Sequence, residues 1–184
     1  CLVGSEMCIR DRIYAYNKPI GQVCTSKDAD PDSIFRYVEF PERVNYVGRL
    51  DKDSTGLLLL TNDGDLANEI QRSRNNHEKE YHVRVNIDIT EDFIKKMSEG
   101  VEILDTVTKP CKVKKTGTRN FSIILTQGLN RQIRRMCDAL HVRVVHLKRV
   151  RIMNIRLGSL RPGEFRTLTR DEEQELRRLV QKRS

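Results

Sequence analysis

The order of apolar and polar residues predicts a series of short strands and helices from about residue 13 onward. Residues 13–16 and 57–60 are continuous apolar runs, which are typical of buried strands. Residues 80–86 alternate instead, and this period of two places Tyr81 and Val83 on one face of a strand. Further strands are expected over residues 106–113, 121–126 and 142–154.

Helices are predicted where apolar residues recur every three or four positions behind a capping residue. This pattern occurs over residues 65–70, 90–97, 130–140 and 169–180. Strands and helices mix without a regular βαβ order, so we predict an α+β fold with a mixed, largely antiparallel central sheet flanked by helices. With 184 residues, the chain can form one sizeable core, or two small lobes that share one.

Residues 1–12 do not continue this pattern. They lack the cleavage site and the long apolar core of a secretory signal, and they resemble a sequencing adapter read into an assembled gene. We interpret residues 1–12 as a non-native start and residues 13–184 as the folded domain.

Composition predicts a soluble, cytoplasmic protein. No apolar run approaches the roughly 18 residues that cross a bilayer. The five cysteines form no Cys-x-x-Cys pair, which argues against a zinc site and a disulfide framework and fits a reducing compartment.

The net charge of +8 is distributed unevenly along the chain. Residues 1–108 contain 14 Lys and Arg against 20 Asp and Glu, a net charge of −6, whereas residues 109–184 contain 20 against 6, a net charge of +14. A strongly basic half indicates a polyanionic partner, most often a nucleic acid, although it can also be an ordinary solvated surface.

Candidate chemistry is concentrated in residues 45–56, a polar loop directly before the leucine run. Asp51 is a candidate nucleophile or base, because a buried strand can hold a loop carboxylate in a fixed orientation. Asp51 and Asp53 could instead only bond the amides of their own turn. A third interpretation is an aspartyl-phosphate phosphatase, since residues 51–55 read Asp-x-Asp-x-Thr. Such a site needs magnesium and follows a hydrophobic strand, whereas here the apolar run comes after the aspartates.

Four stretches, taken in order, resemble the motifs of the RsuA-type ribosomal RNA pseudouridine synthases. They are the Asn-Lys-Pro-x-Gly turn at residues 17–21, the aspartate loop with its leucine strand at residues 48–64, Lys-Glu-Tyr at residues 79–81, and residues 128–136. Residues 77–81 and 127–130 are most similar to the RluF branch of that family.

The resemblance implies the pseudouridine-synthase catalytic fold, with an active-site cleft between two lobes. It implies isomerisation of a specific uridine in 23S ribosomal RNA, and also in the anticodon loop of a tyrosine tRNA, without a cofactor or a metal. Family members usually carry a small S4-type RNA-binding domain before the catalytic one, and residues 1–12 could not supply it.

By the same resemblance, Asp51 is the catalytic aspartate, and Arg134 pairs with it and keeps it ionised. Tyr81 stacks on the target base and assists loss of the C5 proton, while Leu147 packs under the ring. The RNA-binding residues implied are Arg49, Lys79, Asn130, Arg131, Gln132 and Arg135. We expect a monomer; the alternative function is a ribosome- or RNA-binding protein that has kept this fold without catalysis.

Overall fold

The computed structural model describes residues 11–26, 29–72 and 77–181, so the interpretation of residues 1–12 lies almost entirely outside the described residues. These residues form eleven strands and five helices. Their order is β1 (Ile13–Lys18), α1 (Ile34–Tyr37), β2 (Asn45–Val47), β3 (Thr55–Thr61), α2 (Gly64–Gln71), β4 (Lys79–Val85), α3 (Glu91–Glu99), β5 (Glu102–Ile103), β6 (Thr106–Val107), β7 (Lys112–Gly117), β8 (Asn120–Leu125), α4 (Gln132–Ala139), β9 (Val144–Ile152), β10 (Ile155–Arg156), β11 (Phe165–Thr167) and α5 (Arg170–Gln181).

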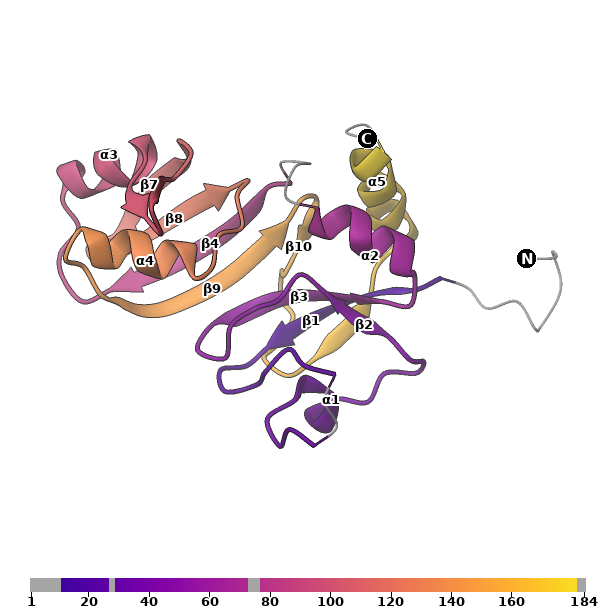
Figure 1. Cartoon of the computed structure of the whole chain (residues 1–184). Coiled ribbons are helices and arrows are strands. Elements are labelled where there is room, and N and C mark those ends of the chain that lie inside the picture. Colours follow the sequence, from indigo (N-terminus) through magenta and orange to yellow (C-terminus); the bar gives the residue numbers. More distant parts are fainter. Residues whose placement is uncertain (1–10, 27–28, 73–76, 182–184) are drawn as a thin grey trace, which may run out of the picture.

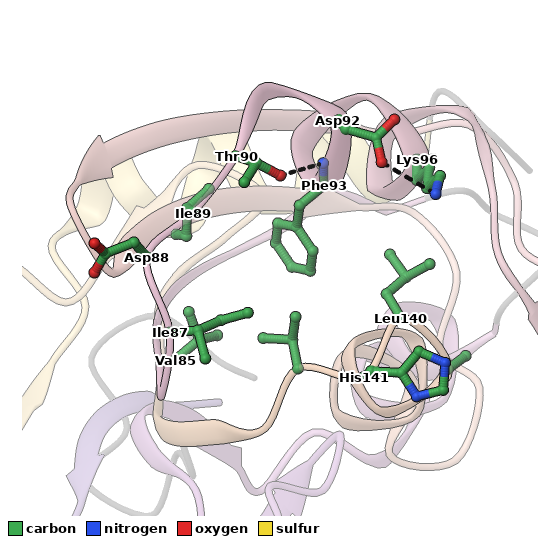
Figure 2. A pocket seen from close by; sticks show the side chains of 12 residues that line it. Val85, Ile87, Asp88, Ile89, Thr90, Asp92, Phe93, Lys96, Leu140 and His141 are labelled. Atoms are coloured by element: carbon green, nitrogen blue, oxygen red, sulfur yellow. Dashed lines mark hydrogen bonds and ion pairs between the residues drawn. The ribbon is translucent and has the colours of Figure 1, made fainter.

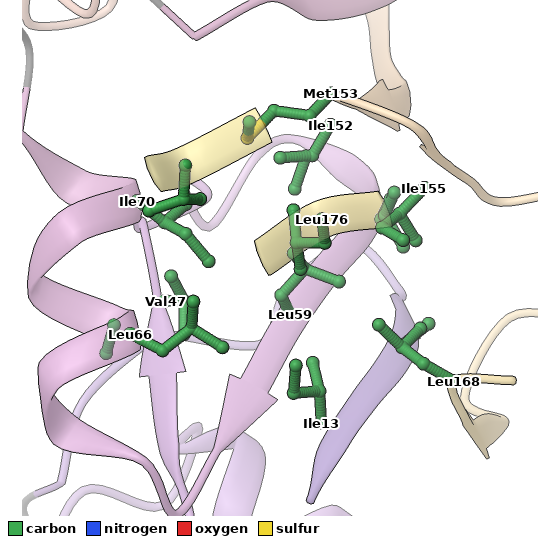
Figure 3. Close-up of a cluster of buried hydrophobic side chains, with 14 of the residues drawn as sticks. Ile13, Val47, Leu59, Leu66, Ile70, Ile152, Met153, Ile155, Leu168 and Leu176 are labelled. Atoms are coloured by element: carbon green, nitrogen blue, oxygen red, sulfur yellow. The ribbon is translucent and has the colours of Figure 1, made fainter. Parts of the chain in front are cut away.

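The leucine run forms β3, and both faces of this strand are buried. Leu57 and Leu59 belong to a cluster with side chains from α2 and α5, part of which Figure 3 shows. Leu58 and Leu60 point the other way, into a second cluster that includes Ile34 at the start of α1. A strand covered on both faces has little freedom to shift, and it therefore fixes the loop that precedes it.

The main sheet has the strand order β11-β1-β3-β9-β4-β8-β7, with β2 added beside β3 and β10 beside β9. β3 pairs with β1 over its length, so its other edge is shared between β2 near the end of the strand and β9 near its start. The β3–β9 pairing joins two lobes, and it spans only Thr55 with Lys148 and Gly56 with Arg149. It is parallel, whereas the other described strand pairs of this sheet are antiparallel.

The lobe beyond this joint contains β4, β7, β8 and β9, and Figure 1 shows α3 and α4 over one face of these strands. The core under the two helices includes Val83, Phe121, Ile123 and Met136. On the opposite face of β4, His82 and Arg84 are exposed. The two faces of this part of the sheet therefore differ, one apolar and covered, the other polar and open.

The α+β class and the mixed, largely antiparallel sheet are confirmed, but the single strand predicted over residues 106–113 is wrong. Residues 102–107 instead form the β5–β6 hairpin, which turns at Leu104 and Asp105 with φ values of 47° and 59°. Pro110 then interrupts the extended backbone, because proline lacks the N–H that a paired strand needs, and β7 begins only at Lys112.

Candidate active site

The loop between β2 and β3 carries two carboxylates that share one arginine. Nη1 of Arg131 lies 3.4 Å from Oδ2 of Asp51, and the two terminal nitrogens of Arg131 donate to the oxygens of Asp53 at 2.9 and 2.7 Å. The hydrogen bond from Arg131 lowers the pKa of Asp53. The two side chains are similarly exposed, at 42% for Asp51 and 47% for Asp53, but Asp51 has only the longer contact with Arg131. Asp51 is therefore the carboxylate that Arg131 engages less.

The backbone of Arg131 explains how its guanidinium meets the loop. Arg131 precedes α4 in the left-handed conformation, with φ 47° and ψ 39°, which is uncommon for a residue other than glycine. Arg134, one turn later, donates instead to the carbonyl oxygen of Asp53 at 2.8 Å and to Oγ of Ser54 at 3.2 Å. The structure thus corrects the prediction that Arg134 pairs with Asp51, since Arg131 makes that contact.

Two further cations hold the backbone of the aspartate loop. Arg149 of β9 is 2% exposed; its Nε donates to the carbonyl oxygen of Leu57 at 2.8 Å and its Nη1 to that of Arg49 at 3.4 Å. Nζ of the fully buried Lys18 lies 3.5 Å from the carbonyl oxygen of Lys52. Together with Arg134, these residues donate to carbonyl oxygens of the loop and of the start of β3, so the position of Asp51 is fixed from several sides.

Lys18 itself is bound inside the Asn-Lys-Pro-x-Gly turn. Its Nζ donates to the carbonyl oxygens of Pro19 at 2.9 Å and Gln22 at 2.8 Å. Burial lowers the pKa of Lys18 to about 8. The N–H of Gly21 completes the junction by donating to the carbonyl oxygen of Lys52 at 2.8 Å.

Gly56 allows β3 and β9 to approach each other at the joint between the lobes. Its φ is +110°, and a Cβ atom there would lie 2.2 Å from the carbonyl oxygen of Arg149. No side chain fits at that distance from a backbone atom. The glycine is therefore required for the loop, the strand and Arg149 to meet.

A cavity of about 480 Å³ opens beside the loop, between the two lobes. Eight of the ten predicted site residues line it, namely Arg49, Asp51, Lys79, Tyr81, Asn130, Arg131, Gln132 and Leu147. Tyr81 pairs in register with Arg149 on one side and with Ile123 on the other, which places the half-buried ring at the end of β4 nearest the loop. Burial lowers the pKa of Lys79 to about 8.

Three of the predicted site residues form hydrogen bonds that hold loops of the protein itself. Arg134 does not line the cavity and acts on the loop backbone. Arg135 also lies outside it and bonds Asn130 through the backbone oxygen at 3.0 Å and the side-chain oxygen at 2.8 Å. Gln132 is only 4% exposed, and its Oε1 accepts from the N–H of Leu129 at 3.2 Å, which fixes the loop before α4.

Sequence reasoning missed Lys18 and Arg149 as parts of the site. Lys18 is the last residue of β1, which is buried throughout, and Arg149 lies two residues after Leu147 on β9. A charged residue on the buried side of a predicted strand is the signal that could have found Arg149. Lys18 had already appeared in the turn motif, but only as a turn residue.

The Asp-x-Asp-x-Thr reading of residues 51–55 has an unfavourable setting for magnesium. Both carboxylates contact Arg131, so a guanidinium occupies the position that a bridging cation would need. The aspartates also precede β3 instead of following a strand of a parallel sheet. Within residues 11–26, 29–72 and 77–181, no group of three or more His, Cys, Asp or Glu is placed to hold a metal ion.

A second hollow, of about 300 Å³, lies between the start of α3 and the end of α4 (Figure 2). Its wall is mainly apolar, with Phe93 and Leu140 facing one another across it. Three of its polar side chains are engaged: Asp92 pairs with Lys96 at 3.0 Å, and Thr90 caps α3. The chemistry-bearing residues converge on the larger cavity instead. In the described part of the chain, no helix is both long and apolar enough to span a membrane.

Comparisons with known proteins agree with this geometry. The family described as RNA pseudouridylate synthase matches residues 12–139. The dual-specificity RNA pseudouridine synthase RluF of Escherichia coli K12 is 53% identical over 172 residues, which cover 94% of this chain and 59% of that protein. The ribosomal large subunit pseudouridine synthase B of Bacillus subtilis 168 is 32% identical over 171 residues, covering 89% of this chain and 70% of that protein.

A solved pseudouridylate synthase superposes with a TM-score of 0.84 at 31% identity, covering 94% of this chain and 75% of the other. The chain spans about 59% of the length of the RluF protein that it matches. A family match over most of the chain, relatives above 30% identity and the same fold agree with the motifs around Asp51 and Tyr81. The chain therefore belongs to the RNA pseudouridine synthases, within their RsuA-type family.

Proposed function

We propose that this chain isomerises a uridine in RNA to pseudouridine, with Asp51 as the reactive group. One observation carries the proposal: Asp51 lies at a cavity also lined by Tyr81 and Leu147, on a loop whose carbonyls are bonded by Arg134 and Arg149. Such a site holds a single reactive carboxylate rigidly next to an aromatic and an aliphatic side chain, which suits a flat uncharged base.

The reaction exchanges one bond to the sugar for another. The bond from C1′ to N1 breaks, the bond from C1′ to C5 forms, the C5 proton leaves and N1 gains a proton, so no oxidant or cofactor is needed. Asp51 assists at the sugar, by attack on C1′ or by removal of a ribose proton. Tyr81 contacts the base and assists loss of the C5 proton. Leu147 supports the ring while it turns.

The target base must leave its stack to enter the cavity, at a cost of a few kcal/mol. Contacts to the RNA backbone offset this cost. Arg49, Lys79, Asn130 and Arg131 line the cavity and are the residues that we assign to RNA contact. Gln132 and Arg135 support them by shaping the turn before α4.

The relatives indicate the substrate class. One is named as a dual-specificity RNA pseudouridine synthase and another as a ribosomal large subunit enzyme. We assign large-subunit ribosomal RNA as the main substrate and a tRNA as a second one. We place the protein in the cytoplasm and expect it to act as a monomer.

Substitution of Asp51 tests the proposal. We expect Asp51→Asn to abolish pseudouridine formation and to leave RNA binding largely intact, because the amide cannot act as a nucleophile or base. The assay is tritium release from 5-tritiated uridine in a ribosomal RNA fragment. Asp53→Asn is the matched control, since Asp53 shares Arg131 but has no reactive role, and it should retain measurable turnover.

Retained turnover in Asp51→Asn would refute the assignment. Activity should also persist in excess EDTA once the RNA is folded. A strict need for a protein-bound metal would favour the phosphatase interpretation, and tight RNA binding with no isomerisation by the unaltered chain would favour the non-catalytic one.

A further inference from the structure

The uncovered face of the second lobe carries a group of basic residues that lies outside the cavity. Three strands contribute five side chains, which we call the cationic sheet face: Lys114 of β7, His82 and Arg84 of β4, and His146 and Lys148 of β9. Side chains alternate between the two faces of a strand. His82 and Arg84 therefore point to the face away from Tyr81 and Val83, which is the side away from α3 and α4.

The pairing register brings these side chains together. His82 lies opposite Lys148, and Arg84 lies opposite His146. Ser122 of β8 pairs with His82 on one side and with Lys114 on the other, which extends the same row across four strands. Side chains opposite one another in adjacent strands are about 5 Å apart at Cβ, so this register places the five basic side chains on one surface, with Ser122 between His82 and Lys114.

The fixed positive charges of this face belong to Arg84, Lys114 and Lys148. Arg84 and Lys148 each lie opposite a histidine in the neighbouring strand. Among the described residues, no acidic side chain forms an ion pair with Arg84, Lys114 or Lys148, and Glu80, at the border, lies 3.6 Å from Arg151. Burial and the charges of Lys148, Arg134 and Arg84 lower the pKa of His146.

Protection of a sheet edge does not explain the face. Lysines on β7 could serve that purpose, because this strand is at the free end of the sheet. Arg84 and Lys148 belong to interior strands, where no edge needs protection. The face also reaches the aspartate loop, since Nε2 of His146 lies 3.4 Å from Oγ1 of Thr55 at the start of β3.

We propose that the cationic sheet face binds the phosphate backbone of the RNA substrate, at a distance from the base that enters the cavity. The inference rests on the proposed function, because it takes RNA as the substrate. Phosphates are the anionic chemistry that a row of Arg and Lys side chains without acidic partners binds best. The face holds RNA without reading its sequence, and it acts from the side of the sheet opposite Tyr81.

The salt dependence of RNA binding tests this proposal. Kd for a fluorescein-labelled RNA hairpin with uridines in its loop would be measured by fluorescence anisotropy at several KCl concentrations. We expect Arg84→Gln and Lys114→Gln each to reduce the slope of log K against log salt by about 1. The ratio of variant to unaltered Kd would then fall about fourfold between about 50 and 200 mM salt. Arg84→Lys should restore the slope.

Lys95→Gln is the matched control, because Lys95 is exposed on α3, on the other side of the same strands. Its slope should equal that of the unaltered chain. Slopes that are the same for Arg84→Gln, Lys114→Gln and Lys95→Gln would overturn the proposal and would be the result if an acidic protein occupied the face. Since the assay measures binding, absence of turnover would refute only the proposed function.

Discussion

At the residue scale, the site contains two lysines whose neutral forms are accessible near physiological pH. Burial lowers the pKa of both Lys18 and Lys79 to about 8. Lys18 donates to three backbone carbonyls and supports the loop, whereas Lys79 lines the cavity. A similar pKa therefore has different consequences: the charge of Lys18 affects the structure of the loop, whereas the charge of Lys79 affects the cavity that we propose for RNA.

Lys79 gives RNA binding a pH dependence with a defined sign. The ammonium is present below a pH of about 8 and is lost above it, so its attraction for phosphate disappears as the pH rises. We expect affinity for an RNA hairpin to fall by about three- to tenfold between pH 7 and pH 9. Lys79→Arg should remove most of this change, because a guanidinium remains charged. An equal loss in both proteins would contradict the assignment.

The motifs identified residues of the site, but they did not identify which of these residues contact one another. The motifs identified Asp51, Tyr81 and Leu147, and all three line one cavity. The predicted partner of Asp51, Arg134, was wrong. Arg131 makes the contact instead, from a left-handed backbone conformation that no residue pattern predicted. Local φ and ψ, and not residue type, determined which arginine meets the carboxylate.

At the element scale, the hydrophobic pattern predicted strands best where both faces of the strand are buried or where apolar and polar residues alternate strictly. β3 and β4 were predicted from four leucines and from a period of two, and both exist. The β5–β6 hairpin was missed because its strands have two residues each, too few to show a period. The pairing of β3 with β9 could not be predicted either, because the residue pattern of a strand does not show which distant strand it pairs with.

The close contact between β3 and β9 predicts that adding one methyl group at Gly56 strongly reduces the stability of the fold. Gly56→Ala places a Cβ 2.2 Å from a backbone oxygen at a φ of +110°. We expect a loss of about 3 kcal/mol in the free energy of unfolding, which is about 6 to 12 °C in Tm. Gly64→Ala, at the open start of α2, is the control and should change stability by less than about 0.5 kcal/mol. Equal Tm values for the two variants would contradict this account of the joint.

At the scale of the whole molecule, Arg149 connects the lobes through the backbone of the loop. Arg149→Met would leave the carbonyls of Leu57 and Arg49 without this donor. We expect a loss of about 2 to 4 kcal/mol in chemical denaturation, and a fall in kcat that exceeds any rise in KM, because Asp51 would lose its fixed position. Arg143→Met, an exposed change just before β9, should have neither effect. A variant at Arg149 with normal kcat would show that the loop does not depend on this residue.

The placement of the loop also has a consequence for the order in which the chain folds. The donors that bond its carbonyls are far away in sequence: Arg134 is 81 residues from Asp53, and Arg149 is 100 residues from Arg49. Contacts of such long range form after local ones, because chain closure must come first. During synthesis, β1 and β3 can pair while the residues of α4 and β9 are still being added. Asp51, which we propose as the reactive group, is thus made early, and we expect it to acquire its working geometry among the last events of folding, when the second lobe closes on the first.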